Sequence, residues 1–146
     1  MSAAGRGAAE FRHRAFWSLF EERHPDERTR RARHGPWFWQ RGLPAFEVVV
    51  TMYVAPEQDA VGVFFGRNER LGAVQVGQRL QPYRPVLEAR LKLRPGQSTD
   101  SLGVNSVWRV NCYAEDNWPA MADWLVTEAT RFERAVAEVL GAERQA

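Results

Sequence analysis

Hydrophobic side chains recur with two different periods along this 146-residue chain, and the period indicates the element. In residues 9–23 they recur every three or four positions, which is typical of an amphipathic helix. The apolar stripe consists of Ala15, Phe16, Leu19 and Phe20. Pro25 ends the helical pattern, and residues 24–36 are predicted to form a charged loop.

A period of two follows and predicts strands. Residues 46–54 (FEVVVTMYV) and 61–65 (VGVFF) both alternate, so the turn between them predicts a β-hairpin. Trp37 and Trp39 share one face of an earlier strand, and we expect that face to join the core. Gly62 marks a bulge or a crowded position within the second hairpin strand.

The next segment has a less regular pattern. Asn68 is suited to begin a helix that runs to about Gln81 and restarts near Pro82 and Pro85. A short strand is expected at 91–94 (LKLR). A longer strand is expected at 104–113, with Trp108, Val110 and Cys112 on one face.

The clearest helical pattern runs from Trp118 to Leu140, and Gly141 is placed to end it. Its apolar positions form one stripe, which predicts a helix packed on a core. Trp124 lies outside that stripe. It either covers a flank of the sheet or faces a partner.

These elements predict an α+β fold with a single antiparallel sheet of about five strands and helices packed mainly on one face. The expected order is α-β-β-β-α-β-β-α. Polar residues alternate with apolar ones in the strands, which favours a sheet covered on one side. We expect residues 1–8 to be disordered, residues 9–141 to form one domain and residues 142–146 to form a tail.

The charge is small overall and uneven along the chain. The formal net charge is +2, but residues 1–43 hold nine arginines against five acids, and residues 110–146 hold three arginines against seven acids. This polarity could attract an anionic partner to one end or allow copies to associate head to tail. The single cysteine, Cys112, and the lack of a leader or membrane segment predict a cytoplasmic protein without membrane contact.

The sequence predicts no catalytic residue, metal site or cofactor. It contains no Gly-Lys-Ser/Thr phosphate loop and no Gly-x-Ser-x-Gly nucleophile turn. Cys112 and the three histidines lack the paired spacing of zinc ligands. Cys112 is therefore expected to be a small buried apolar side chain.

The stretch RTRRARHGPWFWQRG combines basic and aromatic side chains, as nucleic-acid surfaces do. The candidate nucleic-acid-binding residues are Arg28, Arg30, Arg31, Arg33 and Arg41. The alternatives are a solvated loop, partly neutralised by Asp26 and Glu27, and a protein interface. The candidate residues of a protein interface elsewhere are Trp124, Tyr53 and Arg109.

Three segments resemble a known family: FWSLFEERHP, the hairpin VVVTMYVAPEQDAVGVFFG, and DNWPAMADWLVTEATRFERA. Over about residues 11–140 the chain is similar to the bacterial domain of unknown function 4268. Members of that family often follow a nuclease-like domain of the PD-(D/E)XK type. The resemblance implies a role beside DNA restriction or processing, although this chain holds no such nuclease domain.

Our leading hypothesis is a non-enzymatic binding or accessory module that acts with a protein partner, such as a nuclease-like protein, or with nucleic acid. A second hypothesis is a structural homo-oligomer, for example a homodimer, formed through a sheet face or edge. A third is a small enzyme or ligand binder whose pocket is lined by Glu47, Thr51, Tyr53, Arg109 and Asn111.

Overall fold

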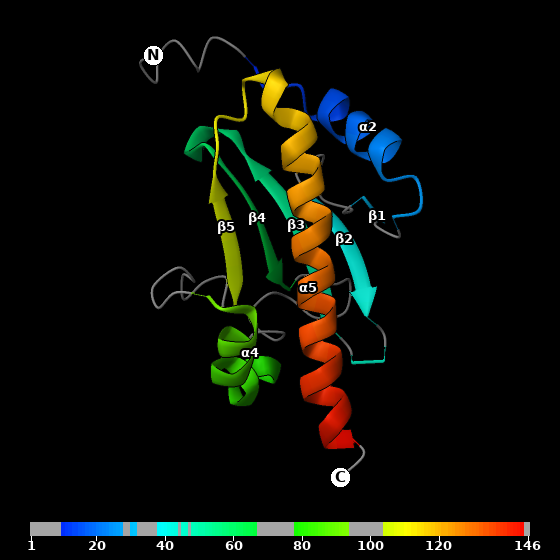
Figure 1. Ribbon diagram of the computed structural model, residues 1–146, viewed down its shortest axis with the longest axis vertical. Coiled ribbons are helices and arrows are strands. Elements are labelled where there is room, and N and C mark those ends of the chain that lie inside the picture. The colour runs from blue at the N-terminus through cyan, green and yellow to red at the C-terminus, as the bar shows by residue number, and fades with distance from the viewer. Residues whose placement is uncertain are drawn as a thin grey trace.

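The computed structural model describes residues 10–27, 30–31, 38–43, 45–46, 48–66, 78–93 and 104–144. These residues form an antiparallel sheet with the strand order β1-β2-β3-β4-β5 and with helices against one face (Figure 1). The strands are β1 (Arg30–Arg31), β2 (Phe38–Leu43), β3 (Val48–Ala55), β4 (Ala60–Phe65) and β5 (Asn105–Arg109). The helices are α2 (His13–Arg23), α4 (Arg84–Leu91) and α5 (Trp118–Arg144).

The predicted fold class, α+β with one antiparallel sheet, is confirmed. The strand count differs from the prediction. The sheet has four strands of five or more residues, and β1 contributes only two residues at its edge. β1 pairs Arg30 with Gln40 and Arg31 with Trp39. A part of the predicted charged loop is therefore the edge of the sheet.

The predicted hairpin is present as β3 and β4. Their register pairs Val50 with Phe65 and Ala55 with Ala60, without a bulge between them. A short 3-10 turn, Pro56–Gln58, and Asp59 in the left-handed conformation (φ 49°) join the strands. Gly62 is a crowded position, since a Cβ there would lie 2.3 Å from the Tyr53 ring.

The core lies between the sheet and α5, which crosses β3 and β4 (Figure 1). Phe132 of α5 packs on Phe65 of β4, with ring centroids 4.9 Å apart. α2 packs beside α5, and its Trp17 stacks on Trp39 of β2 at 5.2 Å. Trp39 therefore joins the core, as alternation predicted, while Trp37 lies outside the described residues.

The strand expected at 91–94 is wrong. Leu91 is the last residue of α4, and Lys92 ends the helix in the left-handed conformation with φ 57°. The N–H of Leu93 then donates to the carbonyl of Glu88 at 2.9 Å. Leu87 and Leu91 are both buried and stand four residues apart, so the helical period governs this segment.

The predicted helical restart is confirmed, because the 3-10 turn Gln81–Tyr83 leads into α4. Asn68 lies outside the described residues.

The opposite face of the sheet is less polar and more buried than alternation suggested. Val49, Thr51, Phe64 and Asn105 lie on it, and all four are buried. Thr51 meets the requirement for a buried hydroxyl by donating to the carbonyl of Gly66 at 2.7 Å. The expectation that this face is solvated is therefore wrong for the middle of β3 and β4.

Gly141 does not end the last helix, because α5 continues to Arg144. A Cβ at Gly141 would meet no atom within 4 Å. Replacement of Gly141 by alanine is expected to raise the free energy of unfolding by about 0.5–1 kcal/mol, because glycine loses more backbone entropy in a helix. Urea unfolding followed by circular dichroism measures this difference. An unchanged or lower stability would show that residues 141–144 are not helical in solution.

Candidate functional site

Arg41 is buried within the protein, which contradicts its prediction as a nucleic-acid contact. Its side chain and that of Glu27 are each 6% exposed. The guanidinium makes a two-pronged ion pair with Glu27, in which Nε donates to Oε2 at 3.0 Å and Nη2 donates to Oε1. Nη1 donates to Glu133 of α5 at 2.8 Å and to Thr130 at 3.3 Å. Arg41 therefore ties β2 to α5 and to the segment after α2, and it is not available to phosphates.

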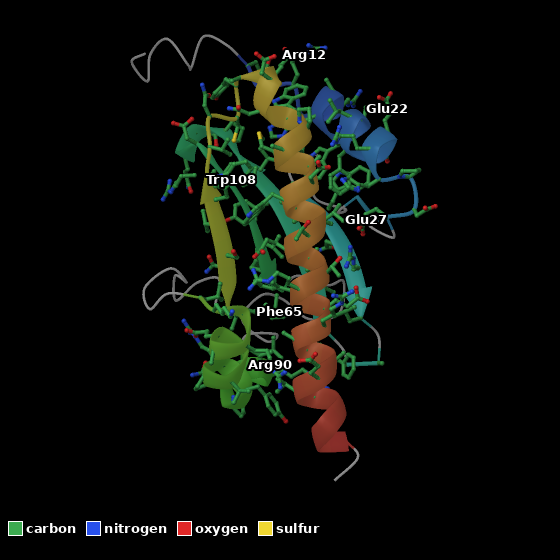
Figure 2. All side chains as sticks on the ribbon, viewed as in Figure 1. Arg12, Glu22, Glu27, Phe65, Arg90 and Trp108 are labelled. Atoms are coloured by element: carbon green, nitrogen blue, oxygen red, sulfur yellow. The ribbon has the colours of Figure 1, made fainter. Side chains whose placement is uncertain are left out.

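The other four predicted arginines are placed only in part. The backbones of Arg30 and Arg31 form β1 at one edge of the sheet, and Arg28 and Arg33 lie outside the described residues. Figure 2 shows Glu27 below the end of α2. Arg30 and Arg31 thus lie at a sheet edge, and Arg30 is three residues after Glu27, whose side chain is buried.

A polar cluster that the sequence did not reveal joins the end of α2 to the first turns of α5. Arg23 donates to both oxygens of Asp123, with Nε–Oδ1 3.0 Å and Nη2–Oδ2 2.6 Å. His24 Nε2 lies 2.8 Å from the same Oδ1. The Arg23 hydrogen bonds hold the pKa of Asp123 below its ordinary value. The cluster joins the end of α2 to α5, and no hydroxyl or thiol contacts its His–Asp pair among the described residues.

Glu128 is a buried carboxylate one helical turn after Trp124. Its Oε1 accepts a hydrogen bond from Arg131, whose guanidinium also donates to the carbonyl of Leu91 at the end of α4. Its Oε2 has no hydrogen-bond partner among the residues that the structure describes. This network links α5 to α4 and brings no second acid to Glu128 among the described residues.

The polar residues proposed to line a pocket do not form a common site. Thr51 is bonded to Gly66, and Arg109 donates to the carbonyl of Gln58 at 2.7 Å. Tyr53 covers Gly62 and packs on Phe64, and burial raises its pKa. Asn111 is exposed and accepts a bond from the N–H of Tyr113. These described residues share no hydrogen bond with one another, and Glu47 is outside the described residues.

β5 is the last strand of the sheet, and its hydrogen-bonding pattern shows which main-chain groups are unused. The N–H of Val110 donates to the main-chain carbonyl of Asp59 at 2.7 Å, and the N–H of Phe65 donates to the main-chain carbonyl of Val104 at 3.4 Å. In an antiparallel ladder such bonds join every second residue, so Ser106 and Trp108 face β4. The N–H and C=O groups of Val107 and Arg109 therefore point outward. In the described part of the chain these groups have no hydrogen-bond partner.

Two tryptophans stand beside this open edge. Trp108 of β5 and Trp124 of α5 are both partly buried, and their ring centroids lie 5.9 Å apart. Figure 2 shows Trp108 on β5, at the outer side of the sheet. Trp124 therefore covers the flank of the sheet, and the same two rings border the open edge. The outward main-chain groups were not predicted, because their direction depends on the strand pairing.

Cys112 is buried, as the sequence predicted, and burial raises the pKa of its thiol to about 12. Because the thiolate is the reactive form, Cys112 is expected to remain unmodified by a thiol reagent at pH 8 in the folded protein and to react fully in 6 M guanidinium. Absorbance of the released chromophore measures the modification. Rapid modification without denaturant would show that the end of β5 opens in solution.

No family model, curated protein or solved structure matches this chain. The resemblance to domain 4268 therefore stays a prediction. Within the described ranges, no helix has the length and apolar character needed to cross a membrane. The described histidines, cysteine and acids form no group of three that could hold a metal ion.

Proposed function

We propose that this protein is a non-enzymatic binding module, and that it makes its contact by adding a strand from another polypeptide to β5. The open edge of β5 carries the proposal. Val107 and Arg109 present two donors and two acceptors in line, and strand addition to such an edge provides main-chain hydrogen bonds. The setting implied by the resemblance is a cytoplasmic DNA-processing or defence system.

The aromatic side chains beside the open edge of β5 support the same proposal. Strand addition gains affinity from the main chain and specificity from side chains that the added strand meets. Trp108 and Trp124 provide a partly exposed aromatic surface beside the edge, and tryptophan is frequent among the residues that dominate binding energy. Arg109 adds one exposed cation at the end of the strand.

A quantitative capture experiment tests the proposal. The tagged full chain is expressed in its own cells beside two variants, Val107→Pro and Ser106→Pro. Proline at 107 removes an outward donor and leaves the ladder to β4 intact, whereas proline at 106 removes a donor that faces β4. We expect Val107→Pro to fold and to lose the polypeptides that the wild type captures. Ser106→Pro is expected to be destabilised. Retention of every captured polypeptide by a folded Val107→Pro variant would overturn the proposal.

The basic segment supports a second candidate, contact with nucleic acid through Arg28, Arg30, Arg31 and Arg33. β1 lies at the edge opposite β5, so the two contacts would not compete. Arginine side chains bind phosphates through electrostatic contacts that weaken with salt.

Fluorescence anisotropy with labelled DNA and RNA at 50 and 200 mM salt tests this candidate. We expect binding that weakens with salt and that is lost when Arg30, Arg31 and Arg33 are all replaced by alanine. Val107→Pro is the matched control and is expected to bind as the wild type does. Absence of binding at low salt, or binding by the triple variant, would remove the nucleic-acid candidate.

A further inference from the structure

We propose that the strand added to β5 is β5 of a second copy of this chain, antiparallel across a two-fold axis at Trp108. This inference rests on the proposed function and names its partner. The two sheets would join edge to edge, and α5 of both copies would lie on the same face, because a two-fold axis perpendicular to the sheet keeps the faces aligned.

The pattern of unused hydrogen-bonding groups is self-complementary in this register. Pairing about Trp108 sets Val107 of one copy opposite Arg109 of the other, and Arg109 opposite Val107. These are the two residues whose N–H and C=O groups point outward without a described partner. Each such pair exchanges two hydrogen bonds in an antiparallel ladder. The register therefore uses the outward groups of both residues in both copies.

The neighbouring registers fit less well. A two-fold axis at Arg109 would set this cation directly opposite its own copy, and like charges in that position are destabilising. An axis at Val107 would pair Arg109 with Asn105, which is buried and engaged in other contacts. The charge of Arg109 and the surroundings of Asn105 thus favour the axis at Trp108.

The tryptophans occupy the centre of the same arrangement. In this register Trp108 faces Trp108 of the second copy as a pair without hydrogen bonds, in which Cα atoms lie about 4.5 Å apart. Aromatic cross-strand pairs of this kind stabilise a sheet. Trp124 already packs on Trp108, so two rings from each copy would fill the space between the two α5 helices. This accounts for two partly exposed tryptophans on a flank that no described element covers.

Sedimentation equilibrium of the full chain between 5 and 500 µM tests for the dimer. We expect a reversible dimer whose Kd rises about tenfold or more in Val107→Pro, because the substitution removes one interface donor from each copy. Arg109→Pro removes the neighbouring outward donor and is a second variant in case the first does not fold. Circular dichroism checks that each variant is folded. A monomer at every concentration, or a dimer that both folded variants retain, would overturn the inference.

Cysteine crosslinking tests the register, since buried Cys112 does not compete. A Val107→Cys protein mixed with an Arg109→Cys protein is expected to form a disulfide-linked heterodimer faster than either protein alone forms a homodimer. Faster linkage of Val107→Cys with itself would overturn the axis at Trp108.

If the chain is monomeric but Val107→Pro still loses a different captured polypeptide, this inference fails and the proposed function stands. If Val107→Pro changes neither the dimer Kd nor the set of captured polypeptides, both this inference and the proposed function fail.

Discussion

Replacement of Arg41 by methionine is expected to lower the free energy of unfolding by about 3–5 kcal/mol, because it leaves the buried carboxylate of Glu27 without its cation. Glu27 loses both of its hydrogen bonds to the guanidinium, and Glu133 loses the bond to Nη1. Folded domains are stable by only about 5–15 kcal/mol, so this single change removes a large share of the total. Urea unfolding followed by tryptophan fluorescence measures the loss.

The double variant Arg41→Met with Glu27→Gln is the matched control. It removes the charge of the more deeply buried acid together with its partner, so it is expected to be more stable than Arg41→Met alone. Glu133 is more exposed than Glu27 and can be hydrated when its partner is absent. A loss below 1 kcal/mol in the single variant would contradict the buried ion pair, and would return Arg41 to the solvent-exposed residues.

Replacement of Phe132 by alanine is expected to cost about 3–5 kcal/mol, the usual range for a buried aromatic side chain. Phe132 is fully buried in the middle of α5 and packs on Phe65 of β4. The substitution loses apolar burial and leaves a cavity between the helix and the sheet. Denaturant unfolding measures the change, and the slope of the transition reports whether the folded state stays compact.

Val86→Ala on α4 is the control for this cavity. Val86 is 51% exposed, so its truncation is expected to change stability by no more than about 0.5 kcal/mol. If Phe132→Ala cost as little as Val86→Ala, α5 would not be packed on the sheet, and the arrangement of layers described above would be wrong.

The layers could be predicted from the sequence because their signals are local. Alternation in residues 46–54 and 61–65 predicted β3 and β4, and the apolar stripe after Trp118 predicted α5. The prediction was wrong at 91–94 (LKLR), where two leucines alternating with two basic residues are too short a pattern to distinguish a strand from the end of a helix. There the burial of Leu87 and Leu91 decides in favour of the helix.

The contact surfaces could not be predicted in the same way, because they depend on distant pairings. Arg41 stands in a basic stretch and resembles its exposed neighbours, yet two of its partners lie 89 and 92 residues further along the chain. The direction of the main-chain groups of Val107 depends on the register with β4. The helical period places Trp124 outside the apolar stripe of α5. Only its contact with Trp108 shows that it lies beside the edge strand β5.

Amide hydrogen exchange in β5 is the measurement that tests the open edge most directly. At low micromolar concentration, the amides of Val107 and Arg109 are expected to exchange rapidly, whereas those of Ser106 and Trp108 are expected to be protected by the ladder to β4. At high concentration, or with a captured partner, the amides of Val107 and Arg109 are expected to become protected. Equal protection of all four amides in the dilute protein, or no gain of protection on association, would contradict a function based on β5.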